Sequence, residues 1–593
     1  MDNWPTVILD DATPGAERLL RFGAPKAVLQ ARRPDEVAPA LAAVTAALAA
    51  GHHVAGWLGY ELGYVLEPHL APLLGPPGDA PLLWFGVFGA PRAIARADLA
   101  AAGRAYAGPL SHEWDAAAYA ARFDRVHRYI EAGDIYQANL SFRSRFAFAG
   151  DPLALYLALR DRAQAAHGAY IDDGERQILS LSPELFFAIS AQGAITARPM
   201  KGTAPRGADE RADVRAKAAL AASPKDRAEN LMIVDLVRND VGRLALIGSV
   251  AVRDLFTVET YPTLHTMVST VTAQLKPATG VEQIVRALFP CGSVTGAPKI
   301  RAMEIIRALE QSPRGLYCGA IGHFAPDGSA SFNVAIRTIT VTQGQGTLGI
   351  GGAVVQDSNA AGEYAECLLK ARYFDSVRRP IGLIETLRHD ATGFVRLDRH
   401  LARMAHSARV LSLSFDRAAA IAALETTVGQ AREPLRVRLT LDEQGVFACT
   451  AAPLGPAQPR WRWALSPHRV NSADALLRHK TTWRAVYDDE HARLAEATGC
   501  DEALFLNERG ELTEGSRTNI FVRRAGTFVT PPLSSGLLDG VLRRELIETG
   551  QCVEAVLTPD DLAAADAVLL GNSLRGLIPA QPVAASALRR GQD

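Results

Sequence analysis

Apolar and polar residues follow two recurring patterns along the chain. Residues 38–51 (APALAAVTAALAAG) are Ala-rich and residues 299–310 (KIRAMEIIRALE) place apolar residues on one helical face, so both segments predict helices. Short runs with β-branched residues, such as 350–355 (IGGAVV) and 382–388 (GLIETLR), predict strands. Because both kinds of segment alternate in the two halves of the chain, we expect α/β or α+β domains.

The pattern breaks near residue 378. An Arg-Arg-Pro sequence at 378–380 follows the helix-like segment 361–374, and a new strand-like run begins directly after it. A chain of 593 residues suggests two to four domains at roughly 100–200 residues each. We therefore predict one domain over residues 1–377 and a second over 378–593.

Composition excludes several classes of protein. The net charge is −1 and no basic block occurs, so nothing points to nucleic acid. The chain has no long apolar run and has acidic residues near its start, which argues against a membrane span or a secretory signal. Its six cysteines are scattered without a C-x-x-C pair. We expect a cytoplasmic enzyme with reduced thiols.

Lysine is rare in this chain. There are eight lysines and fifty-five arginines, and Lys480 is the only lysine after residue 370. Arginine stays protonated, whereas a lysine amine can lose its proton when desolvated and then attack carbon. Lys201 and Lys480 are therefore candidate nucleophiles, and the alternative for each is a solvated surface lysine.

Two pairs of acidic residues have helical spacing. Asp226 and Glu229 are three residues apart, as are Glu363 and Glu366, so each pair lies on one face of a predicted helix. Four such oxygen donors would suit Mg²⁺ if the two pairs converge. Lys370 lies one turn after Glu366 and would favour an anionic substrate. Taken singly, each pair is more typical of a solvated helix face.

Two glycine-containing loops differ in what they predict. Residues 344–349 (GQGTLG) match G-x-G-x-x-G, but a strand-like run follows instead of the helix that a dinucleotide site requires. Residues 291–298 (CGSVTGAP) lead into a predicted helix, whose N-terminal N–H groups favour an anion. An ordinary capped helix is the alternative for the second loop.

Several motifs of the first domain occur in a characteristic order. They are GDIYQANLS (133–141), SLSPELF (180–186), RPMKGTAPRG (198–207), AENLMIVDLVRND (228–240), FPCGSVTGAPKIRAME (289–304), YCGAIG (317–322), FNVAIRT (332–338) and GGAVVQDS with EYAECLLKA (351–371). Over roughly residues 5–375 they resemble the chorismate-utilising enzymes, among them anthranilate synthase component I, isochorismate and salicylate synthases, and aminodeoxychorismate synthase component I. The resemblance implies a large α+β domain, anthranilate synthase component I-like, with helices around antiparallel sheets.

The resemblance also implies roles for matching residues. Glu229 and Glu366 would bind Mg²⁺, with Asp226 and Glu363 supporting it through water; Asp226 departs from the Glu usual in the family. His265 matches the histidine near the departing C4 hydroxyl of chorismate. The positions that would hold chorismate are Thr295, Tyr317, Arg337, Lys370 and the backbone of Gly202, Thr203, Gly351, Gly352 and Ala353.

Lys201 distinguishes members of the family. Anthranilate synthases have Ala at its position, whereas aminodeoxychorismate synthases have Lys. Isochorismate and salicylate synthases activate water with a lysine at the position of Gln137, and a glutamine cannot be that base. The resemblance implies that Lys201 attacks C2 as the C4 hydroxyl leaves, and that ammonia then adds at C4. No cysteine has the setting of a glutaminase nucleophile, so we infer a separate glutamine amidotransferase subunit.

The second domain has its own candidates. Lys480 could form a Schiff base, Glu514 could pair with a protonated pyridine nitrogen, and residues 534–546 could bind phosphate at a helix start. The motifs GLIETLR, LDRHLARMAHSARVL, HKTTWRAVY, DEALFLNERGELTEGSRTNIFV, GLLDGVLRREL and LLGNSLRGLIPA resemble fold-type IV enzymes, which depend on pyridoxal 5'-phosphate (PLP). Over about residues 381–587, the match is best to aminodeoxychorismate lyase within a family that includes branched-chain and D-amino acid aminotransferases.

This second resemblance implies a two-subdomain PLP-dependent domain. It assigns Lys480 to PLP, Glu514 to the pyridine nitrogen, and Arg403, Ser573 and the backbone of Val541 and Leu542 to the phosphate. Leu542 departs from the Thr common in the aminotransferases, so one side-chain phosphate contact is lost. Fold-type IV domains usually form dimers, so a homodimer through this domain is an expectation.

Together the two resemblances imply synthesis of 4-aminobenzoate, the folate precursor. The first domain would make 4-amino-4-deoxychorismate from chorismate, and the second would eliminate pyruvate from it. Three alternatives stay open: an anthranilate-type synthase fused to an aminotransferase, the same C4-aminating synthase fused to a true transaminase, and a chain in which one half is a non-catalytic module.

Overall fold

The computed structural model describes residues 5–584 except 77, 79, 262, 263 and 432. Contacts divide these residues into two units. The first comprises residues up to 100, 109–146 and 155–377, and the second comprises 101–108, 147–154 and the chain from 378 onward. The end of the second resemblance, residues 585–587, lies outside the described residues.

Two large and mostly antiparallel sheets build the first unit. One has the order β17 (Gly296–Ala297), β9 (Gln137–Gly150), β21 (Gln345–Val354), β20 (Thr338–Thr342), β11 (Gln177–Ser182), β10 (His167–Asp172), β1 (Thr6–Asp11), β2 (Arg18–Phe22) and β6 (Arg92–Ile94), with β8 (Ser111–His112) beside β9. The other has the order β14 (Met200–Pro205), β16 (Leu264–Gln274), β13 (Ala194–Ala197), β12 (Leu185–Ile189), β19 (Ala330–Val334), β18 (Ala320–Phe324), β4 (His53–Leu58), β5 (Leu83–Phe88) and β3 (Ala27–Ala31), with β15 (Ala251–Thr260) beside β16.

Continuous apolar runs mark the strands that are buried on both faces. In β5 (LWFGVF) every residue is buried, and in β4 (HVAGWL) every residue after His53 is buried. Such runs bounded by turns are consistent with fully buried strands. Glycines allow these neighbours to lie close, because a Cβ on Gly56 would lie 2.1 Å from the Trp84 carbonyl oxygen.

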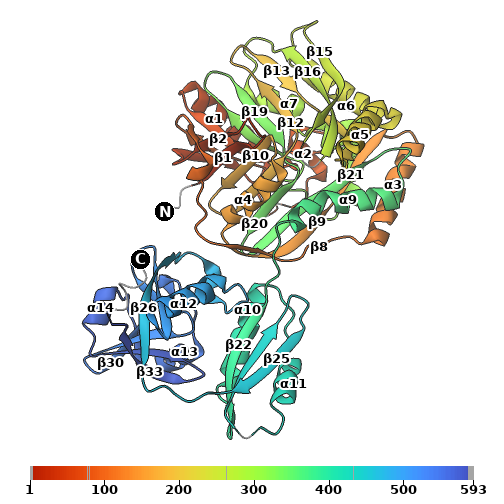
Figure 1. The fold of residues 1–593 in the computed structure, drawn as a ribbon. Coiled ribbons are helices and arrows are strands. Elements are labelled where there is room, and N and C mark those ends of the chain that lie inside the picture. The colour runs from red at the N-terminus through yellow and green to blue at the C-terminus, as the bar shows by residue number, and fades with distance from the viewer. Residues whose placement is uncertain (1–4, 77, 79, 262–263, 432, 585–593) are drawn as a thin grey trace. The chain divides into compact units, whose positions relative to one another are not determined.

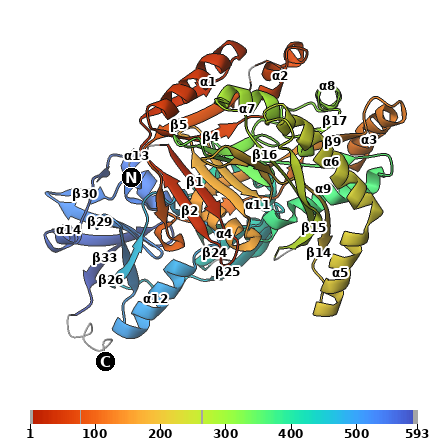
Figure 2. The ribbon, with the colours of Figure 1, turned by 90° about the horizontal axis from the view of Figure 1, so that it is seen from above.

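Helices cover the sheets of the first unit and carry the acidic pairs. They are α1 (Pro34–Ala49), α2 (Leu62–Leu66), α3 (Ala116–Glu131), α4 (Pro152–Ala163), α5 (Glu210–Ala222), α6 (Pro224–Gly242), α7 (Val281–Leu288), α8 (Lys299–Leu309) and α9 (Ala360–Asp375). Helices α3 and α9 lie side by side along β21 (Figure 1), and α1 packs on α7 (Figure 2). Helix α6, which packs on β14 and β16, begins where the Ser223 hydroxyl accepts a hydrogen bond from the Asp226 N–H.

The second unit contains a small sheet and a closed barrel (Figure 1). The small sheet has the order β23 (Gly393–Phe394), β22 (Leu383–Asp390), β24 (Leu435–Leu441) and β25 (Phe447–Pro453), with α10 (Leu397–Val410) and α11 (Arg417–Val428) packed on it. The larger sheet has the order β28 (Leu512–Gly515), β27 (Glu502–Asn507), β26 (Trp461–Val470), β33 (Gly576–Pro582), β32 (Ala567–Asn572), β29 (Asn519–Arg524), β30 (Thr527–Thr530) and β31 (Cys552–Glu554). Because β28 also pairs with β29, six of these strands close into a ring.

Three further helices complete the second unit: α12 (Ala485–Thr498), α13 (Val541–Glu548) and α14 (Pro559–Ala563). The mixture of mainly antiparallel sheets and helices in both units confirms the predicted α+β class. Among the residues described, no helix combines the length and the apolar composition that a membrane crossing needs. The six cysteines are free thiols, as expected.

Two short segments belong to the second unit although they precede residue 378. Strand β7 (Ala105–Ala107) pairs with the last residues of β9, and both segments lie in this unit. Tyr106 is fully buried there beside Leu387 and Leu439. The two strands approach closely at Gly150, which has φ +99° and whose Cβ, if present, would lie 2.0 Å from the Arg104 carbonyl oxygen. The boundary expected from sequence did not include these segments.

Gly150→Ala should destabilise the protein by more than about 3 kcal/mol, because it adds a backbone clash to the cost of a left-handed alanine. Gly133→Ala is the matched control: Gly133 has φ +79° and open space around the position of its Cβ. The control should lose only the roughly 1–2 kcal/mol of the left-handed conformation. Thermal unfolding by calorimetry measures both, and equal losses would contradict the close approach at Gly150.

Candidate active sites

Lys201 lies where strand β14 departs from regular pairing with β16. The register shifts between Met200 and Thr203, and Thr203 then pairs with Thr266. Gly202 has φ +81°, and a Cβ there would lie 2.7 Å from Oδ1 of Asp226. The glycine therefore lets the strand that carries the lysine lie against the start of α6.

Charged groups from three elements converge on Lys201. Burial lowers the pKa of its ammonium group, and the negative charges of Glu229 on α6 and Glu184 oppose that effect. Lys370 and Glu366, both on α9, also act on it electrostatically. The groups that act electrostatically on Lys201 thus include residues of both helices that carry the acidic pairs.

The four acidic side chains provide hard oxygen donors but face different partners. Glu366 pairs with Lys370 at 2.8 Å, Glu229 lies 3.8 Å from Lys225, and Glu363 accepts a hydrogen bond from the Ser358 hydroxyl at 2.7 Å. Burial raises the pKa values of Glu229 and Glu363. Within the described residues, no group of three or more His, Cys, Asp or Glu side chains is close enough to enclose a metal ion.

The other residues predicted to hold chorismate lie in the same unit. Burial lowers the pKa of the Arg337 guanidinium, and this side chain forms no ion pair with any acidic residue in the described part of the chain. Lys370 donates a hydrogen bond to the Gly351 carbonyl at 3.1 Å, and a Cβ on Gly352 would lie 3.3 Å from Oε2 of Glu363. A partly buried cation without a counterion is suited to an anionic ligand.

Tyr317, Thr295 and Ala353 complete that set. The Arg143 guanidinium lies over the Tyr317 ring at 5.4 Å from its centroid. The Thr295 hydroxyl is buried and donates to the Cys291 carbonyl at 2.8 Å, just before β17. Ala353 lies on β21, in the strand that also provides Gly351.

His265 is held on both sides of its ring. Its Nε2 lies 3.0 Å from the Asp213 carboxylate and its Nδ1 lies 3.0 Å from the Thr260 hydroxyl. Asp213 also pairs with Arg206 at 2.7 Å. The residue is 1% exposed and pairs with Ala204 across β14 and β16, so this strand pair carries both His265 and Lys201.

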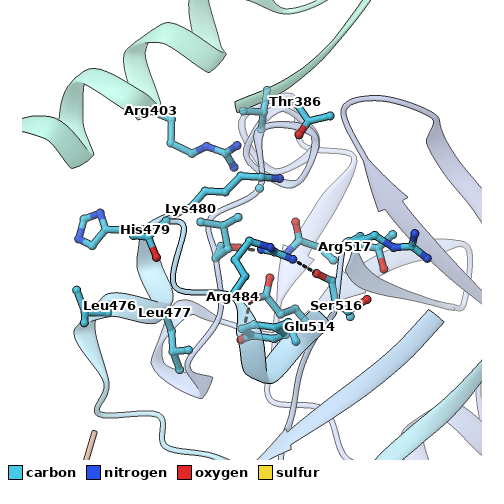
Figure 3. A pocket seen from close by; sticks show the side chains of 18 of the residues that line it. Thr386, Arg403, Leu476, Leu477, His479, Lys480, Arg484, Glu514, Ser516 and Arg517 are labelled. Carbon is cyan, nitrogen blue, oxygen red and sulfur yellow. Dashed lines mark hydrogen bonds between the residues drawn. The ribbon is translucent and has the colours of Figure 1, made fainter. Parts of the chain in front are cut away.

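A cavity in the second unit, partly open to solvent, has Lys480 in its wall (Figure 3). The side chains of Lys480 and Arg403 extend side by side into it, Arg403 from α10. Burial and the positive charges of Arg403 and Arg484 lower the pKa of Lys480 to about 7. The lowered pKa favours the neutral form of its amine.

A buried acid lies on the other side of the same cavity. Glu514, on β28, accepts a hydrogen bond from the Tyr487 hydroxyl at 3.2 Å. Burial raises the pKa of Glu514 to about 7, although the Leu538 backbone N–H and Arg484 favour its ionised form. A cation placed beside Glu514 would ionise it.

The predicted phosphate residues also meet at this cavity. Arg403, Ser573 and Val541 line it, and Val541 opens helix α13 after Gly540. Gly540 is required there, because a Cβ would lie 1.8 Å from Oδ1 of Asn519. The Leu542 side chain packs in the apolar core beside Phe521, which leaves only its backbone N–H for a ligand.

Residues 6–375, more than half of the chain, match the family described as chorismate binding enzyme. The chain belongs to the chorismate-binding enzyme family. Residues 382–583 match the family described as amino-transferase class IV. The crystal structure of anthranilate synthase component I from Streptococcus pneumoniae TIGR4 has a TM-score of 0.50 at 22% identity, and the match covers 63% of this chain and 92% of that one. The predicted order, a chorismate-binding domain followed by a fold-type IV aminotransferase-like domain, is confirmed.

Curated relatives match part of the chorismate-binding enzyme. "Aminodeoxychorismate synthase component 1" of Klebsiella aerogenes is 45% identical over 268 residues, covering 45% of this chain and 58% of the relative. "Aminodeoxychorismate synthase" of Streptomyces pristinaespiralis is 48% identical over 249 residues, covering 42% of this chain and 35% of the relative. The chain thus spans between about a third and three fifths of these relatives.

The chorismate-binding domain contains two polar groups that sequence reasoning did not select. Glu184 is 3% exposed, and burial raises its pKa to about 7 while Ser293 and Lys201 oppose the shift. Gln137 is fully buried, and neither polar atom of its side chain has a hydrogen-bond partner among the described residues. Both lie inside quoted motifs, but a motif does not show whether a side chain is buried.

The aminotransferase-like domain of this chorismate-binding enzyme contains an unforeseen buried network. Glu385 accepts hydrogen bonds from Arg403 at 2.6 and 2.9 Å and contacts Nδ1 of His400 at 2.6 Å. Nε2 of His400 lies 2.8 Å from the Ser573 hydroxyl. One carboxylate therefore positions both side chains that were assigned to the phosphate.

The Glu385 carboxylate should stabilise the second unit in a pH-dependent manner. Burial opposes its ionisation, but Arg403 and His400 outweigh burial and lower the pKa of Glu385 from 4.5 to about 2. A pKa lowered on folding stabilises the native state above the unfolded pKa, and this contribution is lost as pH falls through the folded pKa. Glu385→Gln should therefore cost roughly 3 kcal/mol above pH 5 and progressively less towards pH 2.

Urea unfolding of wild type and Glu385→Gln between pH 3 and 7 measures this difference. Glu548→Gln is the control, because Glu548 pairs with Arg399 at the surface, where a pair contributes about 0–1 kcal/mol. A difference for Glu385→Gln that does not change with pH would contradict the ionic network.

Proposed function

We propose that the chain converts chorismate to 4-aminobenzoate in two reactions, one in each domain. The observation that carries the proposal is a pair of buried or partly buried lysines with lowered pKa values, each among groups suited to one reaction. Lys201 lies among carboxylates and Lys370, whereas Lys480 lies between Arg403 and Glu514.

In the first reaction, Lys201 attacks C2 of chorismate and the C4 hydroxyl leaves. Ammonia then adds at C4, and the C2–N bond breaks to release the lysine and 4-amino-4-deoxychorismate. A lysine must be neutral to attack, and burial lowers the pKa of Lys201, which favours that form. Arg337 and Lys370 would bind the substrate carboxylates, and His265 would lie near the departing hydroxyl.

Glu184 is suited to proton transfer in this reaction. Its pKa of about 7 allows it to exchange a proton near neutral pH, and Lys201 acts on it electrostatically. The attacking amine must lose a proton as the C2–N bond forms. We infer that Glu184 accepts that proton and returns it when the lysine leaves.

Mg²⁺ is the second part of the proposed chorismate site. The support is the chemistry of the donors, since Asp226, Glu229, Glu363 and Glu366 provide carboxylate oxygens on two helices whose charges act on one another. Glu229 and Glu366 would hold the ion, which supplies positive charge for a substrate carboxylate. Asp226 and Glu363 would orient water around it.

Ammonia would come from a separate glutamine amidotransferase. The buried cysteines Cys291 and Cys367 have pKa values raised to about 12 by burial, and Cys318 and Cys552 to about 11, so none of these four provides a thiolate at neutral pH. The matched Klebsiella relative is named as component 1 of its synthase, which fits a partner that supplies ammonia.

The second reaction would require PLP, which supplies an electron sink for the bonds broken beside the substrate amine. The residues of the cavity fit it: Arg403, Ser573 and the start of α13 would hold its phosphate, Lys480 would bind it, and Glu514 would face the ring nitrogen. Lys480, once released, would move the proton that elimination of pyruvate requires. Aromatisation to 4-aminobenzoate makes the reaction favourable. We further propose a homodimer through this domain.

Replacing each lysine should stop a different reaction. Lys201→Ala should slow formation of 4-amino-4-deoxychorismate from chorismate and ammonia by at least about 1,000-fold, as is usual when a nucleophile is removed. Lys480→Ala should leave that reaction intact, so 4-amino-4-deoxychorismate accumulates in place of 4-aminobenzoate and pyruvate. Chromatography of products formed with chorismate, Mg²⁺, PLP and ammonium measures both.

Spectroscopy gives a control that does not depend on turnover. Wild type and Lys201→Ala should show the visible absorbance of lysine-bound PLP, which borohydride removes, and Lys480→Ala should lack it. Pyruvate release by Lys480→Ala would refute the lyase reaction, and undiminished amination by Lys201→Ala would refute the covalent role. Anthranilate among the products would support the anthranilate-type alternative instead.

Glu366→Gln should raise the Mg²⁺ concentration needed for amination by about tenfold or more, because an amide is a poorer ligand for a hard cation. Glu282→Gln on α7 is the matched control. Like Glu366 with Lys370, Glu282 pairs with a cation four residues later, and the two side chains are 46% and 49% exposed. Titration of activity with Mg²⁺ after EDTA treatment tests this, and identical curves for both variants would contradict the metal site.

A further inference from the structure

Arg104 lines the cavity that contains Lys480, although it precedes Lys480 by hundreds of residues. It lies in segment 101–108, which falls inside the range matched by the chorismate-binding family and yet belongs to the second unit. The aminotransferase-like match begins only at residue 382, so it does not account for this arginine.

The segment that carries Arg104 is firmly anchored in the second unit. The Tyr106 ring meets the Trp483 ring edge-on at 6.2 Å, and Arg378 donates a hydrogen bond to the Ala107 carbonyl at 3.1 Å. The Arg104 carbonyl accepts a hydrogen bond from the Asp151 N–H at 2.8 Å. These contacts fix the backbone from which the arginine reaches the cavity.

The Arg104 guanidinium is oriented by two contacts. Its Nε donates to the Asp474 carboxylate at 3.2 Å and its Nη1 donates to the Trp483 carbonyl at 2.8 Å. Its Nη2 makes no hydrogen bond to any residue that the structure describes, and the side chain is 37% exposed whereas Asp474 is 8% exposed. The buried Asp474 carboxylate therefore holds one edge of the Arg104 guanidinium and leaves another part of it accessible to solvent.

Two other arginines that line the cavity have different hydrogen-bond partners. Arg403 is bound by both oxygens of Glu385, and Arg484 donates a hydrogen bond to the Ser516 carbonyl. The charge of Arg104 acts on Tyr487, whose hydroxyl donates to Glu514, so the arginine lies near the part of the cavity wall that contains these two residues. A guanidinium with a free edge is suited to a carboxylate.

We propose that Arg104 binds a carboxylate of the substrate in the PLP site and contributes to its specificity for an anionic substrate. This inference rests on the proposed function, in which the substrate carries two carboxylates in addition to its amine. It follows that the second active site requires a residue from before residue 378. A protein that began at residue 378 would lack this contact.

Chorismate can test the contact without turnover. It carries the same two carboxylates but has a hydroxyl where the substrate has an amine, so it can bind without reacting with PLP. The full-length holoenzyme would be titrated with chorismate in EDTA and without ammonia, with the visible absorbance of PLP as the signal. Arg104→Gln and Arg104→Met should each weaken binding at least tenfold, and Arg104→Lys should restore part of the affinity.

Arg462→Gln is the matched control, because Arg462 pairs with Asp501 at 3.5 Å and is not part of the cavity wall. Its affinity for chorismate should equal that of wild type. PLP content and unfolding temperature of each variant would be measured together with the affinity. Arg104→Met keeps the apolar part of the side chain. If Arg104→Gln does not retain PLP, the chorismate affinity of Arg104→Met decides the outcome.

Two results would overturn the inference. One is wild-type affinity in both neutral Arg104 variants, and the other is a wild-type protein whose PLP absorbance does not respond to chorismate. Failure of the proposed lyase reaction gives a different result: a wild type that responds to chorismate but releases no pyruvate from 4-amino-4-deoxychorismate. That result would leave the role of Arg104 standing.

Discussion

Removal of lysine ammonium groups from water is the constraint on which both sites depend. A charged amine loses hydration when buried, so its neutral form becomes favoured and its pKa falls. Around Lys201 the carboxylates of Glu229 and Glu184 limit this effect, whereas around Lys480 the arginines Arg403 and Arg484 reinforce it. The scaffold therefore lowers the pKa of two lysines by different arrangements of charge.

The sequence predicted the parts of the sites that short motifs contain. The scarcity of lysine singled out Lys201 and Lys480, and helical spacing predicted that Glu363 and Glu366 share one face of α9. Short runs with β-branched residues indicated strands, and residues 350–354 of the run IGGAVV lie in β21. These predictions depend on residues that are close in sequence. Over such short stretches, the spacing determines which face of a helix or strand a side chain lies on.

Contacts between distant segments could not be predicted from the sequence. Glu385 and His400 were visible in their motifs, but only the fold places both beside Arg403 and Ser573. Glu184 was visible as well, yet its pKa depends on the burial that distant strands impose. The position of Arg104 is the extreme case, because nothing in residues 101–108 indicates that they belong to the second unit.

The discontinuous second unit has a consequence for synthesis of the chain on the ribosome. Residues 101–108 and 147–154 leave the ribosome long before the strands that they accompany, which begin after residue 378. At about 5–20 residues per second the interval is on the order of tens of seconds. During that time Tyr106, fully buried in the finished protein, has to be protected by transient contacts or by a chaperone. Folding of the two units during translation is thus ordered in time, with the first able to close before the second is complete.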